Sequence, residues 1–174
     1  MTRVGVCKDR LAEAFERFGR VPVIQKTESV PASHPIFRQD ESVPWWAAGG
    51  LLHDGGGRVL LLRHVPSKGW GDVWLTPGGK LEEGETVLQG FEREVREEVG
   101  TQVLDPLLTK ILQQNLTDGK RVRHGYFAQF LARIDGDVNA GPDVLEVRWF
   151  DELPQDMAFR EDYIEDFRRL VHAR

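Results

Sequence analysis

The sequence predicts an α/β fold in which helices cover a mixed β-sheet, and the main reason is the alternation of two kinds of segment. Short apolar runs bounded by glycine and proline are interleaved with two well-separated stretches of helical periodicity, at residues 86–99 and 162–172. The chain has 174 residues, and 40% of them are hydrophobic. This is the size and composition of one globular domain with a substantial core.

Charge and cysteine content exclude several classes of protein. The net charge is −5, which argues against a surface that binds bulk nucleic acid. The single cysteine, Cys7, rules out an internal disulfide framework and a four-cysteine zinc site. The start of the chain lacks the apolar core of a secretory signal, and no stretch approaches the ~18 apolar residues of a membrane helix. We therefore expect a cytoplasmic protein that has no membrane partner.

Residues 1–43 are interpreted as an N-terminal extension. Four apolar residues recur there at helical spacing: Leu11, Ala14, Phe15 and Phe18. Gly19 follows them and predicts the end of a short helix. An edge strand is expected near residues 21–25, and a long proline-containing loop follows it.

From residue 45 onward, strands and turns follow closely. The apolar run at 45–52 predicts a buried strand, and Asp-Gly-Gly-Gly at 54–57 predicts the turn of a hairpin. We expect the remaining strands at residues 59–63, 73–75, 103–113, 122–133 and 145–150. The short strand at 73–75 is expected to stop at a loop, Thr-Pro-Gly-Gly, and Gly100 is expected to end the helix at 86–99.

The helix at 86–99 carries an unusual cluster of acids. On a helical wheel, Glu94, Glu97 and Glu98 lie together on the flank of the apolar face, and Gly90 lies among them one turn earlier. Three carboxylates at this spacing repel one another, and a divalent cation among them would reverse that repulsion. The simpler alternative is a solvated charged helix, because runs of charge usually face water.

The spacing of these residues resembles the signature of the Nudix hydrolase family. Gly79 is followed after five residues by Glu85 and after seven more by the run REVREEVG at 93–100. Thr101 is the one departure, because the family usually has a bulky aliphatic residue there. Further likeness in the runs VLLLR, WLTPGGK and EVRWF extends the resemblance from residue 45 to the C-terminus.

This resemblance implies a Nudix domain over residues 44–174, with an α/β/α sandwich and a mixed β-sheet between its helices. It implies that Glu94, Glu97 and Glu98 hold Mg²⁺ or Mn²⁺ together with a backbone carbonyl near Gly78. Arg93 would then orient Glu94, and Glu85 would be a supporting acid.

The same resemblance implies a general base among the carboxylates. Glu98 is the first choice within the signature. Glu146 is the best candidate from a later segment, and Asp143 stands behind it. The alternative for Glu146 is an ordinary charge at the edge of a strand.

Candidate substrate contacts lie outside the acidic cluster. For phosphate they are Arg63 and Lys80, while the cluster Lys120, Arg121 and Arg123 could equally be the basic rim of a hairpin. Four aromatic residues are candidates for stacking on a base: Trp45, Trp46, Trp70 and Tyr126. Tryptophans in a chain of this size are more often part of the core.

Two functions follow from the resemblance. The first is a Mg²⁺-dependent hydrolase that cleaves the diphosphate linkage of a nucleoside diphosphate joined to another group. Nucleotide sugars, nucleoside triphosphates and dinucleotides all remain open as substrates. The alternative is a catalytically silent sensor with the same fold, which binds such a ligand without cleaving it. The N-terminal extension could also support a homodimer.

Overall fold

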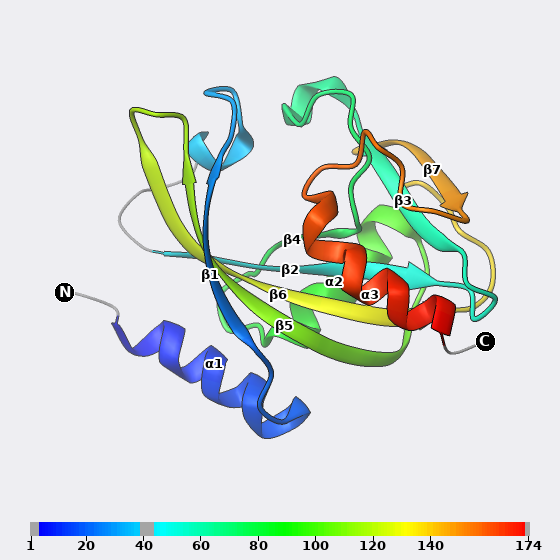
Figure 1. Cartoon of the computed structure of the whole chain (residues 1–174), viewed down its shortest axis with the longest axis horizontal. Coiled ribbons are helices and arrows are strands. Elements are labelled where there is room, and N and C mark those ends of the chain that lie inside the picture. The colour runs from blue at the N-terminus through cyan, green and yellow to red at the C-terminus, as the bar shows by residue number, and fades with distance from the viewer. Residues whose placement is uncertain (1–3, 39–43, 173–174) are drawn as a thin grey trace.

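The computed structural model describes residues 4–38 and 44–172, with side chains from residue 9 onward (Figure 1). It contains three helices: α1 (Val4–Phe18), α2 (Val87–Val99) and α3 (Arg160–His172). The 3₁₀ turns are η1 (Pro35–Arg38) and η2 (Pro66–Lys68). The strands are β1 (Val23–Ser29), β2 (Trp45–His53), β3 (Val59–His64), β4 (Gly78–Lys80), β5 (Val103–Thr117), β6 (Val122–Ile134) and β7 (Val144–Phe150).

The strands form one mixed sheet in the order β1-β5-β6-β2-β3-β7, and β4 pairs with β2 beside this path. The pairs β1–β5 and β2–β6 are parallel, and the other pairs are antiparallel. The predicted α/β class with a mixed sheet between helices is therefore confirmed.

Two cores lie on opposite faces of the sheet, because successive residues of a strand point to opposite sides. In β3, Leu60 and Leu62 belong to the core that α1 and α2 cover. The intervening Leu61 belongs to a second core, which Tyr163 of α3 helps to form. Helices thus cover both faces and complete an α/β/α sandwich (Figure 1).

Helix α2 follows the sequence prediction closely. Thr86 is its N-cap, and a reciprocal capping box with Gln89 satisfies backbone N–H groups of the first turn. Gly100 ends the helix in the left-handed region, at φ 67°, and its N–H donates to the carbonyl of Arg96. Thr101, which departs from the family pattern, is buried, and its hydroxyl donates to the carbonyl of Asp135 at 3.2 Å.

Three expected boundaries were wrong. Residues 78–80 form β4, where a loop was expected. Glycine allows the backbone to lie close against β2, because a Cβ at Gly78 would be only 2.5 Å from the Ala48 oxygen. Residues 73–75 form only single bridges, in which Leu75 pairs with Leu62 and Trp74 with Met157. Strand β5 continues to Thr117 because β1 and β6 pair with it on both sides.

The N-terminal segment packs against the rest of the chain. Ala14 is fully buried, and the ring of Phe18 meets that of Phe130 edge-on with centroids 5.5 Å apart. Strand β1 is an edge of the sheet. The division at residue 43 remains a prediction, and residues 39–43 lie outside the described part of the chain. No helix within that described part combines the length and apolar character needed to cross a bilayer.

Candidate active site

The three acids predicted as a cluster lie on α2, and they differ in burial. Glu98 is only 8% exposed, while the Glu97 side chain is 58% exposed. The backbone N–H of Gly78 donates to Glu98 Oε2 at 2.9 Å, so β4 fixes one oxygen of this carboxylate. The carboxylate carbon of Glu94 would be 2.6 Å from a Cβ at Gly79. The glycine pair thus lets the strand come into contact with two of the acids.

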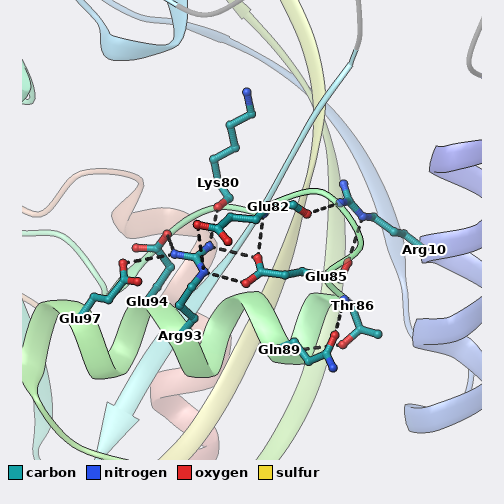
Figure 2. A network of polar contacts seen from close by, with 9 residues as sticks. All are labelled: Arg10, Lys80, Glu82, Glu85, Thr86, Gln89, Arg93, Glu94 and Glu97. Atoms are coloured by element: carbon teal, nitrogen blue, oxygen red, sulfur yellow. Dashed lines mark hydrogen bonds and ion pairs between the residues drawn. The ribbon is translucent and has the colours of Figure 1, made fainter.

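Arg93 connects the acids of α2 to the loop before the helix (Figure 2). Its Nε donates to Glu85 Oε1 at 2.7 Å, and its Nη2 donates to the carbonyl oxygen of Lys80 at 2.9 Å. Its Nη1 donates to Glu94 at 2.8 Å and to Glu97 at 3.3 Å. One guanidinium therefore holds three carboxylates and one backbone carbonyl, which its fixed fork of donors allows.

Helix α1 holds the same loop from its other side. Arg10 Nε donates to the carbonyl oxygen of Glu85 at 3.2 Å, and its Nη2 donates to that of Glu82 at 2.8 Å (Figure 2). Gly90 leaves room for the loop, because a Cβ there would be 2.8 Å from Leu81 and 3.2 Å from Glu85. The loop is thus fixed by contacts from both helices.

His64 is a site residue that the sequence did not reveal. Its Nε2 lies 3.3 Å from Glu98 Oε1, and its Nδ1 lies 3.2 Å from the carbonyl oxygen of Asp143. Strand β3 alternates between the two cores, and His64 falls on the side that faces α2. A single histidine at the end of a strand carries no sequence signal for this role, so only the tertiary structure identifies it.

The environment perturbs the pKa values of the acids in opposite directions. Burial raises the pKa of Glu98 to about 8, and the neighbouring Glu94 and Glu97 charges add to this. Burial also raises the pKa of Glu94, against the opposing effect of Arg93. The pKa of Glu85 is lowered, mainly by its hydrogen bond with Arg93. A buried and a half-buried carboxyl with raised pKa values, beside a carboxyl whose pKa is lowered, are typical of a functional site.

A largely apolar cavity adjoins the acids. Gly78, Gly79 and His64 belong to both features, because they line the cavity and also contact Glu94 or Glu98. Rings from several elements line the remainder: Trp45, Trp70, Phe127, Phe159, Tyr163 and His34. Gln114 and Asp162 add polar groups to the wall. An apolar cavity with a few polar groups beside perturbed acids has the character of a ligand site.

The donor set suits a hard divalent cation. Glu94, Glu97 and Glu98 offer carboxylate oxygens, which Mg²⁺ and Mn²⁺ prefer. Within residues 4–38 and 44–172, no three acids, histidines or cysteines already converge on one point. Arg93 binds Glu94 and Glu97 in this arrangement, so these flexible side chains would have to turn toward Glu98 to share a cation. A buried carboxylate with two further carboxylates on its helix face fits such a group.

Several predicted residues lie away from the cavity wall. Arg63 is paired with Asp72 and Asp156 and covers the ring of Trp74, in the core below α3. Glu146 is opposite Arg63 in the strand register and is paired with Arg148. The roles proposed for Arg63 and Glu146 remain predictions.

The four aromatic candidates separate into two pairs. Trp46 is buried and stacks on Tyr126, with centroids 4.8 Å apart, and neither residue lines the cavity. Trp45 and Trp70 do line it. The stacking roles remain predictions, and the structure supplies a cavity position for the second pair alone.

Lys80, Asp143 and the basic cluster fall in three different places. Lys80 lines the cavity, while its side chain extends away from the acids (Figure 2). Asp143 pairs with Lys68 at 2.7 Å, close to His64. Arg121 is bound to Asp118 in the turn between β5 and β6, and Arg123 is buried. The turn position of Arg121 agrees with the hairpin-rim alternative.

Comparisons with known proteins place these features in a wider group. The family model described as NUDIX domain matches residues 43–167. A Bacillus subtilis protein named "Uncharacterized Nudix hydrolase YvcI" is 40% identical over 65 residues, which are 37% of this chain and 39% of that protein. The mouse "8-oxo-dGDP phosphatase NUDT18" is 27% identical over 139 residues, 76% of this chain and 40% of that protein.

The fold is shared with solved structures. A NUDIX hydrolase from Nitrosomonas europaea superposes with a TM-score of 0.57 and 25% identity, and the match covers 75% of this chain and 90% of that one. The two curated relatives are matched over about two fifths of their own length. The match to the family model includes α2, the glycine pair and most of the cavity wall.

Proposed function

The chain belongs to the NUDIX domain family, and on this premise we propose that it is a hydrolase that cleaves the diphosphate linkage of a nucleoside diphosphate derivative. Two relatives support this reaction type, because one is named for dephosphorylation of 8-oxo-dGDP and another is an "8-oxo-dGTP diphosphatase" from Proteus vulgaris. The group attached to the diphosphate is left open by this proposal.

The observation that carries the proposal is the position of the acids beside the aromatic cavity. A nucleoside derivative has an apolar planar base and an anionic diphosphate, so it needs an apolar site next to a site for charge. Gly78 and His64 line the cavity and also contact Glu98, so the two sites meet at these residues. A base in the cavity would bring its diphosphate to the acids of α2.

A divalent cation completes this assignment, and we assign Mg²⁺ or Mn²⁺ to the acids. The residues that would hold it are Glu94, Glu97 and Glu98, with a backbone carbonyl near Gly78. When bound, such a cation offsets the negative charges of the carboxylates and the diphosphate, and it lowers the pKa of coordinated water.

The chain's own residues supply positioning and proton transfer. The Gly78 N–H donates to Glu98 Oε2 and favours the ionised carboxylate, in which Oε1, the oxygen beside His64, would accept a proton from the attacking water. His64 Nε2 lies 3.3 Å from this oxygen, and contact of its Nδ1 with the Asp143 carbonyl fixes the position of the ring. Arg93 orients Glu94 through its hydrogen bond at 2.8 Å.

Replacement of Glu98 by glutamine tests the proposal. Glu98→Gln keeps the size of the side chain and an oxygen for the Gly78 N–H, but it removes the carboxylate that accepts the proton. We expect kcat to fall by about 10²-fold or more, as is typical when a general base is lost. The measurement is a panel of nucleoside diphosphate derivatives incubated with Mg²⁺ or Mn²⁺, with products resolved by mass.

Glu92→Gln is the matched control, because Glu92 lies on the same helix and lines neither the cavity nor the acid cluster. It should retain the wild-type rate. Cleavage at the diphosphate that is lost in Glu98→Gln alone would support the hydrolase. Metal-dependent binding of a panel member without turnover of any would reject it in favour of the sensor alternative.

A further inference from the structure

His34 is a buried polar residue in the cavity wall. The proposed reaction assigns it no role. It lies just before η1, it is 8% exposed, and it lines the cavity together with Pro35 and Ile36. All three residues precede position 43, where the match to the family model begins. This part of the wall is therefore supplied by the chain's N-terminal segment.

The protonation of the His34 ring follows from its hydrogen bonds. The backbone N–H of Ile36 donates to His34 Nδ1 at 3.2 Å, so Nδ1 is an acceptor and carries no proton. Burial lowers the pKa of His34 to about 4, so the ring is neutral near pH 7. A neutral imidazole keeps one proton, which must therefore be on Nε2.

That Nε2–H group has no hydrogen-bond partner, although it is buried. A buried donor without an acceptor costs free energy, and native proteins rarely leave one unpaired. The ring of Trp70 packs edge-on against His34 with centroids 4.6 Å apart. Trp70 is half-buried and lines the same cavity as His34.

We propose that His34 is a specificity-determining residue, whose Nε2–H donates a hydrogen bond to a carbonyl oxygen or ring nitrogen on the edge of a nucleobase held in the cavity. This inference rests on the proposed function, because it takes the ligand to be a nucleoside derivative. A base edge that presents an amino group to this position would meet one donor with another, so His34 discriminates between bases.

Two variants separate the donor from the ring. His34→Phe keeps an aromatic ring against Trp70 and removes the donor, while His34→Gln removes the ring and keeps an N–H group. Both variants lose the Nδ1 atom that accepts from the Ile36 N–H, so any change in the backbone of η1 should occur in both of them. His124→Ala is the control, because His124 lies on β6 outside the cavity wall.

The experiment is titration of the full chain with GMP, AMP, CMP and UMP in Mg²⁺, followed by tryptophan fluorescence. Monophosphates contain no diphosphate linkage, so hydrolysis does not interfere, and Trp70 reports occupation of the cavity. We expect the wild type to prefer one or two of the four. His34→Phe should weaken binding of the preferred nucleotide about tenfold and leave the affinity for the most weakly bound nucleotide unchanged. His34→Gln should bind each nucleotide within about threefold of the wild-type affinity.

Equal weakening of all four nucleotides by His34→Phe would overturn the proposal, because the residue would then be structural. An unchanged order of preference, or no binding of any nucleotide, would overturn it too. Thermal unfolding of each variant verifies that it is folded, and Trp70→Phe should remove most of the fluorescence change. If the nucleotides bind selectively as predicted but the wild type cleaves none of the nucleoside diphosphate derivatives, the hydrolase proposal is rejected and the His34 proposal stands.

Discussion

Arg93 shows how much of the site depends on one side chain. It binds Glu85, Glu94, Glu97 and the Lys80 carbonyl, so it connects α2 to the loop that carries the glycine pair. Its pKa is raised, mainly by its hydrogen bond with Glu85, so the guanidinium stays charged throughout the working range of pH. A side chain with a single ammonium group cannot reproduce contacts in so many directions.

We therefore expect Arg93→Lys to lower kcat by about 10–100-fold and to raise the Mg²⁺ concentration needed for half-maximal activity, as is typical when a residue that orients a metal ligand is lost. Steady-state kinetics at several Mg²⁺ concentrations measure both quantities. Arg96→Lys, on the exposed part of the same helix, should leave them unchanged. A fall in thermal stability with normal Mg²⁺ dependence would contradict the positioning role.

Residues also set the limit of what the sequence could predict about the site. Helical spacing alone predicts that Glu94, Glu97 and Glu98 lie together, whereas the role of Arg93 was expected only from the family resemblance. His64 and His34 come from separate segments and meet the cavity only through long-range packing. No local pattern distinguishes them from other histidines of the chain.

At the scale of elements, the β5–β6 hairpin depends on one carboxylate in its turn. Asp118 accepts hydrogen bonds from the backbone N–H groups of Lys120 and Arg121 and from the Arg121 guanidinium. These bonds lower the pKa of Asp118 to about 2. The ionised form is thus the one that the folded turn favours.

The sign of the pH effect follows directly. Because the folded pKa is below the ordinary value of 3.8, this stabilisation is present above pH 3.8 and is lost as the pH falls toward 2. We expect Asp118→Asn to lower the urea midpoint at pH 7 and to lower it less at pH 3. Asp135→Asn, at an exposed aspartate after β6, should show little difference at either pH. A decrease in the urea midpoint of Asp118→Asn that is equal at both pH values would contradict this account.

The elements were predicted unequally, for physical reasons. Helix α2 has strong periodicity, a capping box and a terminal glycine, so its extent was clear from the sequence. Strand β4 is Gly-Gly-Lys and has no strand propensity, and it forms only because β2 accepts its backbone at close range. Residues 73–75 looked like a strand by composition, yet they find only single bridging partners.

At the scale of the whole molecule, the N-terminal segment contributes to both core and site. Helix α1 buries Ala14, packs Phe18 against Phe130 and holds the loop before α2 through Arg10. The loop that follows β1 supplies His34 to the cavity wall. The sequence indicated a helix and a strand here, but their packing depends on distant partners that local patterns do not identify.

Removal of residues 1–19 should therefore destabilise the entire domain. Loss of α1 exposes the apolar surface around Phe130, at a cost of ~25 cal/mol for each Å² of apolar surface returned to water. We expect a lower urea midpoint for the truncated chain, together with a lower kcat. Arg10→Ala should reproduce part of the loss in kcat with a smaller loss of stability. An unchanged midpoint after truncation would show that the segment is a separable extension.

The parallel pairing of β1 with β5 also imposes an order of events on folding. Partners such as Gln25 and Gln113 are 88 positions apart, so β1 leaves the ribosome long before the strand beside which it must lie. Closing so long a loop is entropically costly and slow, and parallel strands offer no local turn to begin it. The β5–β6 hairpin can form locally and present a template to which β1 attaches late. The first strand made is then among the last to be secured, and until then its exposed Val23 and Ile24 favour contacts with other nascent chains.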